Sequence, residues 1–243
     1  MPETMERTEA MSQPLRRPAL TAGLGLLTMA ILAGATSVLV IEGLVTADNA
    51  AQTASDVLAS EGLFRFGIVA LLVVAILDVI VAWGLYAFFA PVDEGLSRIA
   101  AWLRVAYGAS FVVAIAHLMG AVGLLNDSQT ATGADVGLLQ ADALQQITLY
   151  QEIWSMGLAV FGVHLVLIGY LALVSGYVPK WLGALIALAG IGYVVDSVGA
   201  ILMADFPITV SLVTFIGEVL LMAWLLVRGR RVVVPVTSGT TPG

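Results

Sequence analysis

The sequence predicts an all-α polytopic membrane protein: a six-transmembrane-helix bundle with two short interfacial helices in its outer loops. Of its 243 residues, 60% are hydrophobic and 11% are charged, whereas a soluble globular domain carries about a quarter charged residues. Six apolar runs reach the length of about 20 residues that a helix needs to cross a bilayer. Strand-like alternation is absent, so helices are the expected way to satisfy backbone hydrogen bonds in lipid.

The six apolar runs are separated by polar segments. They cover residues 20–45, 62–90, 99–125, 148–174, 181–203 and 208–228. We therefore expect a transmembrane domain over residues 19–229, between disordered cytoplasmic tails at residues 1–18 and 230–243. Because residues 1–18 lack the apolar core of a signal peptide, the first run is expected to stay in the protein.

Basic residues are sorted to one side of the predicted membrane. Nine of the ten lie in the tails or around the turns after the second and fourth runs, and Arg65 lies on the opposite side. Loops rich in Lys and Arg remain in the cytoplasm. This pattern predicts a multi-pass protein of the plasma (inner) membrane with both termini in the cytoplasm.

Local signals mark the segments between the runs. The Ala-rich segment after the first run offers Thr53 or Ser55 as a helix N-cap, which predicts one short interfacial helix. Pro91 ends the second run, and the short turn that follows makes the second and third runs antiparallel neighbours. Residues 136–147 form a weakly amphipathic pattern, which predicts the second interfacial helix. Residues 175–180 form a tight polar corner between the fourth and fifth runs.

Five acidic or histidine residues lie in the middle of the apolar runs, away from their ends, where a charge costs at least roughly 2.5 kcal/mol. They are Asp78, His117, His164, Asp196 and Glu218. From a rise of about 1.5 Å per residue, Asp78 and His164 lie roughly 12 to 14 Å from the cytoplasmic face, and His117 with Asp196 roughly 21 to 22 Å from it. We expect two layers of carboxylate and imidazole groups, with Glu218 between them, in an intramembrane polar network.

Further charged residues lie near the ends of the runs. Arg65, Glu42 and Glu152 share the outer boundary, which predicts a structural ion pair that joins three helices. Arg104 and Lys180 are expected to extend their charged ends to the membrane interface. These residues are therefore assigned to helix packing and anchoring.

Aromatic residues near the ends of the runs predict packing at the membrane surface or in the core. We expect this of Tyr107 and of four tryptophans, Trp83, Trp102, Trp181 and Trp224. None of these side chains is assigned a functional role from the sequence.

The residue types exclude several kinds of site. The chain has no cysteine and two histidines, which lie at different depths and form no HExxH pair, so no metal site and no cofactor are predicted. Lys180 is followed by Trp181, so no phosphate-binding loop is expected. The expected partners are membrane lipids and not nucleic acid; a small-molecule ligand and the oligomeric state stay open.

Three functions are compatible with these residues. The first is a membrane module that binds or passes a small molecule, lipid or proton through the polar network. The second is a structural or interaction protein whose polar residues specify helix packing, and the third is an intramembrane metal-dependent hydrolase. The sequence favours a protein without catalytic activity and identifies no catalytic residue.

Five motifs in fixed order carry a resemblance to a known family. They are LFRFGI with Arg65, the LY…PV end of the second run, the corner SGYVPKWLG, GYVVDS with Asp196, and IGEVLLMAWLL with Glu218 and Trp224. The chain resembles a bacterial integral-membrane family catalogued as domain of unknown function 4386. The resemblance covers most of the chain and implies an integral plasma-membrane protein, with no activity and no catalytic residues.

Overall fold

The computed structural model describes residues 12–203 and 216–235. Within them, five helical segments are long and apolar enough to cross a membrane, which indicates an integral-membrane protein. These spans are Arg16–Leu44, Glu61–Phe89, Glu94–Ser128, Ala134–Val174 and Lys180–Leu202. The predicted sixth run begins outside the described residues, and its described part is helix α9 (Ile216–Val227). A sixth span therefore stays a prediction.

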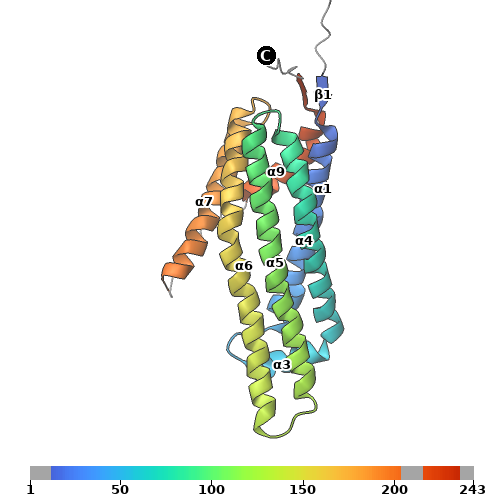
Figure 1. Cartoon of the computed structure of the whole chain (residues 1–243). Helices are drawn as coiled ribbons and strands as arrows, with labels where there is room; N and C mark the ends of the chain where they lie inside the picture. Colours follow the sequence, from blue (N-terminus) through green and yellow to red (C-terminus); the bar gives the residue numbers. More distant parts are fainter. Residues whose placement is uncertain (1–11, 204–215, 236–243) are drawn as a thin grey trace, which may run out of the picture.

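The long helices pack side by side (Figure 1). In chain order the helices are α1 (Arg16–Thr36), a π-helical segment (Ser37–Ile41), α2 (Glu42–Leu44), α3 (Ala50–Ala59), α4 (Glu61–Phe89), α5 (Glu94–Ser128), α6 (Ala134–Val174) and α7 (Lys180–Leu202). Helix α5 packs against α4 and α6, while α1 packs on α4 and α7 packs on α6. Helix α9 contacts both α1 and α7, so it joins the two outer helices of the bundle.

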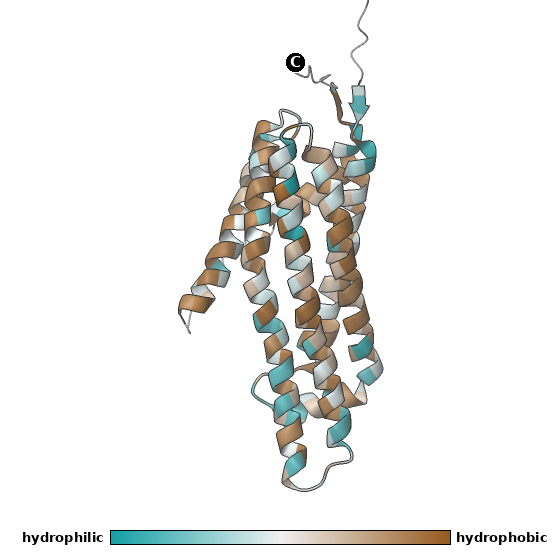
Figure 2. Ribbon diagram, viewed as in Figure 1, coloured by the Kyte–Doolittle hydropathy of each residue, from teal (hydrophilic) through white to brown (hydrophobic). Residues whose placement is uncertain are grey.

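The outward face of the spans is apolar. Figure 2 shows hydrophobic residues concentrated along the middle of the long helices and hydrophilic residues nearer their ends. Among the large side chains, Phe66 is 67% exposed, Trp102 65% and Ile76 56%. Such an extensive apolar surface is unfavourable in water and is covered by acyl chains in a bilayer.

Helix α3 is the short helix expected in the first outer segment. Its N-cap is Asn49, whose side chain accepts a hydrogen bond from the Gln52 amide at 3.0 Å. The prediction of Thr53 or Ser55 as the cap is wrong, because Thr53 instead exchanges two hydrogen bonds with the backbone of Thr46. The location of α3 at the membrane interface stays a prediction.

The second outer helix is not a separate element. Residues 136–147 form the first turns of α6, which continues without a break from Ala134 to Val174. This stretch contains no proline, so each amide can bond to the carbonyl four residues earlier. The prediction of a distinct interfacial helix here is therefore wrong.

The two ends of the described chain pair with each other. Strand β1 (Ser12–Pro14) lies antiparallel to β2 (Val233–Pro235), and the amide of Leu15 donates to the carbonyl of Val232 at 3.0 Å. Leu15 is completely buried. The prediction of disordered tails is wrong for these residues, because strand pairing and burial of Leu15 order them. Residues 16–18 belong to α1 and residues 230–231 to a short 3-10 helix, Gly229–Arg231, so the prediction is wrong for them too. Residues 1–11 and 236–243 of the tails lie outside the described part of the chain.

Hydrogen bonds from side chains stabilise the corner between α6 and α7. The Ser175 hydroxyl accepts a hydrogen bond from the Val178 amide at 3.1 Å, and Gly176 has a φ of +74° that glycine adopts without strain. The Tyr177 hydroxyl donates to the Phe88 carbonyl at 2.9 Å. Burial raises the pKa of Tyr177, so this hydroxyl remains a hydrogen-bond donor.

Helices α6 and α7 pack with their backbones close together. A Cβ atom added at Gly169 would lie 2.5 Å from the amide nitrogen of Ala187 and 2.8 Å from its Cα. Small residues allow such a close approach between helices in a membrane. This contact brings the polar residues of α7 alongside those of α6.

Candidate functional site

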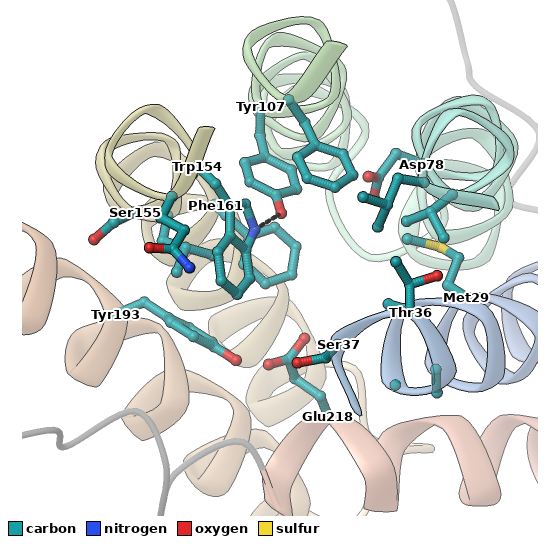
Figure 3. Close-up of a pocket in the computed structure, with 18 of the residues that line it drawn as sticks. Met29, Thr36, Ser37, Asp78, Tyr107, Trp154, Ser155, Phe161, Tyr193 and Glu218 are labelled. Carbon is teal, nitrogen blue, oxygen red and sulfur yellow. Dashed lines mark hydrogen bonds between the residues drawn. The ribbon is translucent and has the colours of Figure 1, made fainter. Parts of the chain in front are cut away.

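A cavity of about 920 Å³ lies within the bundle. Its walls come from α1, α4, α5, α6, α7 and α9, and Figure 3 shows side chains from these helices around one space. Helix α1 contributes the small residues Ala30, Ala33 and Gly34 and, at Ser37, the start of its π-helical segment. Short side chains leave room here, and π-helical insertions are frequent at functional sites.

Arg104 of α5 occupies the interior between three helices. Its side chain is 2% exposed, and Nη2 lies 2.8 Å from Oδ1 of Asp78 on α4, whose side chain is 1% exposed. On the other side, Nη1 lies 3.4 Å from Nε2 of His164 on α6. One buried cation therefore connects the carboxylate and the imidazole.

The ring of His164 is held in one orientation. Its Nδ1 lies 2.8 Å from the carbonyl oxygen of Ala100, which can only accept a hydrogen bond. Nδ1 therefore carries the proton, and Nε2 is left to accept from the Arg104 guanidinium. A neutral imidazole in this tautomer is compatible with the neighbouring positive charge.

Asp78 and His164 thus lie around the same group, Arg104. The prediction that Arg104 reaches the membrane interface is wrong. Its side chain turns inward because a carboxylate, an imidazole and the face of Phe161, 5.2 Å from the guanidinium carbon, surround it. Sulfur Sδ of Met29 on α1 lies 3.8 Å from Nη2.

Hydrogen bonding in this buried cluster is incomplete. Asp78 forms its ion pair through Oδ1, whereas its Oδ2 and Nε of Arg104 have no hydrogen-bond partner among the described residues. Buried polar atoms without partners are rare and costly. Both residues line the cavity, so this is where a bound molecule could complete their hydrogen bonding.

Aromatic residues form another part of the cavity wall. Nε1 of Trp154 on α6 donates to the Tyr107 hydroxyl on α5 at 3.0 Å, as Figure 3 shows. Tyr107 also packs against the rings of Phe111 and Phe161. The sequence prediction for Tyr107 as a packing residue accounts for its burial and not for its position in the cavity wall.

Acidic residues from α7 and α9 also line the cavity. Glu218 of α9 extends toward the hydroxyl of Tyr193 on α7 (Figure 3), and Asp196 lies one turn farther along α7. Asp78, Asp196 and Glu218 therefore contribute to one cavity, although they come from three helices.

His117 does not join this group. Its Nδ1 lies 2.6 Å from Oε1 of Gln146 on α6, and His117 is not among the residues that line the cavity. The expected pairing of His117 with Asp196 is therefore wrong: α6 lies beside α5 at this level and supplies an amide partner. His117 has a local role between these two helices.

Arg65 pairs within its own helix. Its Nε lies 2.7 Å from Oε1 of Glu61, one turn earlier on α4, whereas Glu42 accepts a hydrogen bond from Ser37. The predicted ion pair of Arg65 with Glu42 and Glu152 is wrong, because Glu61 is the nearer carboxylate and needs no contact between helices.

We expect Arg65→Ala to leave the stability of the bundle unchanged. The pair with Glu61 is exposed, with side-chain exposures of 46% and 31%, and exposed pairs of this kind contribute little. The measurement is the melting temperature of the purified full chain in detergent beside that of the wild type. A large decrease would show that Arg65 makes a contact between helices.

The described residues contain no group of three or more His, Cys, Asp or Glu side chains arranged to hold a metal ion. His117 and His164 make separate contacts with Gln146 and Arg104. The hypothesis of a metal-dependent hydrolase therefore finds no ligand set in this part of the chain.

Two cavity residues, Arg104 and Trp154, are assigned no role in an internal site from the sequence. Arg104 precedes Tyr107 by three positions and Phe111 by seven, a spacing that places all three on one face of a helix. This periodicity could have indicated an inward position for Arg104. No comparable signal distinguishes Trp154, whose partner comes from another helix.

Comparison with known proteins gives a family. A relative from Archaeoglobus fulgidus, named "Uncharacterized protein", is 32% identical over 166 residues, which cover 68% of this chain and 85% of the relative. No solved structure matches the chain. The family model described as "Domain of unknown function (DUF4386)" matches residues 21–229. This confirms the resemblance carried by the five motifs, and the chain belongs to the DUF4386 family.

Proposed function

We propose that this protein is a plasma-membrane module that binds a small molecule in the cavity between α1, α4, α5, α6, α7 and α9. The observation that carries the proposal is the buried Asp78 carboxylate in the cavity wall: Oδ1 contacts Arg104, while Oδ2 has no hydrogen-bond partner among the described residues. The cavity's volume of about 920 Å³ is near the upper end for small-molecule sites. We place both termini in the cytoplasm, because the basic residues gather at that side.

A purely structural role is the competing function. Buried ion pairs can specify helix packing without a ligand, and the Arg104 cluster would serve that purpose. That role does not require an open cavity beside the cluster, whereas ligand binding does. Water and solutes in the cavity therefore distinguish the two functions.

The absence of cysteine from the chain makes this distinction measurable. Ala33 on α1 lines the cavity, whereas Ala35, two residues later, is exposed on the outward side. We expect Ala33→Cys to react with the water-soluble, neutral reagent methyl methanethiosulfonate, and Ala35→Cys to react much more slowly. The reason is that reaction needs a thiolate, which forms in water and not among acyl chains.

The experiment uses the full chain in lipid nanodiscs, with the rate of modification followed by mass spectrometry. If Ala33→Cys is as unreactive as Ala35→Cys, the cavity is closed to water, and the structural role is the better account.

A further inference from the structure

The charges that line the cavity are strongly unbalanced. Four carboxylates face it, from Glu42, Asp78, Asp196 and Glu218. Among the described residues of the lining, Arg104 is the one basic side chain, and residues 204–215, which lie outside the described part, contain no Lys or Arg in the sequence. With every group ionised, the cavity carries an excess of negative charge. Glu42 is exposed, whereas Asp78 is buried, where the dielectric constant is low.

The buried Asp78 carboxylate is an independent indication of a ligand. Arg104 contacts Oδ1, and Oδ2 has no hydrogen-bond donor among the described residues although Asp78 is 1% exposed. A carboxylate oxygen in this state is satisfied by an N–H or O–H donor or by a cation, and not by another acceptor. Glu218 approaches the same space from α9 on the opposite wall (Figure 3).

The remaining walls of the cavity suit an organic cation that carries an apolar chain. The rings of Trp154 and Tyr193 border the space beside Glu218 (Figure 3), and aromatic faces attract organic cations. Along α1 and α9 the lining is apolar and includes Leu26, Ala30 and Met222. The cavity therefore combines acidic and aromatic groups with an apolar wall.

We propose that the ligand is an amphiphilic organic cation, with an ammonium group between Glu218, Asp78 and the aromatic rings and an apolar chain along α1 and α9. This inference rests on the proposed function and specifies its ligand class. The same carboxylates would repel a fatty acid or another anion of equal length. A cavity that takes only protons would not discriminate between amphiphiles by their head group.

The first test compares reagents of opposite charge at one position. In Ala33→Cys, we expect the trimethylammonium-bearing methanethiosulfonate to react about ten-fold or more faster than the sulfonate-bearing one, relative to their rates with free thiol. Glu218→Gln should reduce this ratio. Asp127→Asn, which removes the same charge from an exposed position outside the cavity, should leave it unchanged.

The second test measures protection of Ala33→Cys against methyl methanethiosulfonate by three amphiphiles of equal chain length. Dodecylamine should slow the reaction at concentrations at least about ten-fold lower than dodecanol or dodecanoate. Glu218→Gln should remove this preference without abolishing folding, since the buried ion pair of Arg104 is with Asp78 and not with Glu218. We avoid Asp78 in this test because its loss leaves Arg104 without its carboxylate.

The outcomes separate the two proposals. Equal protection by dodecylamine and dodecanol would overturn the cationic ligand and preserve the binding cavity. Preference for dodecanoate would also overturn it and identify Arg104 as the group that recognises the ligand. An unreactive Ala33→Cys, in a protein that folds normally, would remove the proposed function together with this inference.

Discussion

Arg104→Met is expected to destabilise the bundle by about 3 to 5 kcal/mol, the effect of removing one partner from a buried ion pair. The substitution leaves the Asp78 carboxylate buried without its cation and removes the group that faces Nε2 of His164. Thermal unfolding of the full chain in detergent, followed by circular dichroism, measures the loss. Arg98→Met is the matched control on the same helix, because the Arg98 side chain is 49% exposed.

A double variant tests whether the unpaired charge causes that loss. Asp78→Leu combined with Arg104→Met replaces both charges with apolar groups, and exchange of a whole buried pair is often neutral. We expect the double variant to recover most of the stability that Arg104→Met loses. The single variants Asp78→Leu and Arg104→Met are measured beside it. If the double variant loses as much stability as the two single variants lose together, the pair contributes through packing and not through charge compensation.

Gly169→Ala is expected to cost roughly 1 to 3 kcal/mol, the range for overpacking of a tight interior. The new methyl carbon would lie 2.5 Å from the backbone nitrogen of Ala187. Because the obstructing atoms are backbone and not the end of a flexible side chain, α6 and α7 must separate. The shift would also displace Tyr193 and Asp196, which α7 brings to the cavity.

Gly123→Ala is the control for the intrinsic effect of the same substitution. Gly123 lies within α5, and a Cβ there would meet nothing within 4 Å. Alanine favours a helix over glycine by up to about 1 kcal/mol, so this variant should be as stable as the wild type or more stable. Equal melting temperatures for both alanine variants would contradict the close packing of α6 and α7.

The sequence predicts five of the spans found among the described residues, because the signal for a span is local. Each apolar run contains its own length and composition, and the hydrogen bonds of a helix lie within the run. The separate helix at residues 136–147 was predicted from a weak amphipathic pattern. In the structure these residues continue directly into the rest of α6, because no residue between them and the apolar run interrupts the helix.

The cavity was predictable in its residue types and not in its contacts. The ionisable residues Asp78 and His164 within apolar runs indicate an internal polar site, since lipid makes isolated charges costly. Depth alone, however, does not state which side of a helix a residue faces. His117 and Asp196 share a calculated depth, yet His117 contacts Gln146 and Asp196 lines the cavity. Arg104 lies near a helix end, where extension to the interface is the usual outcome.

The pairing of β1 with β2 has a consequence for biosynthesis. These strands lie far apart in the sequence, so Ser12 cannot pair with Pro235 until all the helices between them have been synthesised. Until then the amide of Leu15 has no Val232 carbonyl to bond. In a nascent chain that stops before residue 232, the first helix must therefore stay in the translocation machinery or the bilayer without the β1–β2 pairing and the Leu15–Val232 hydrogen bond.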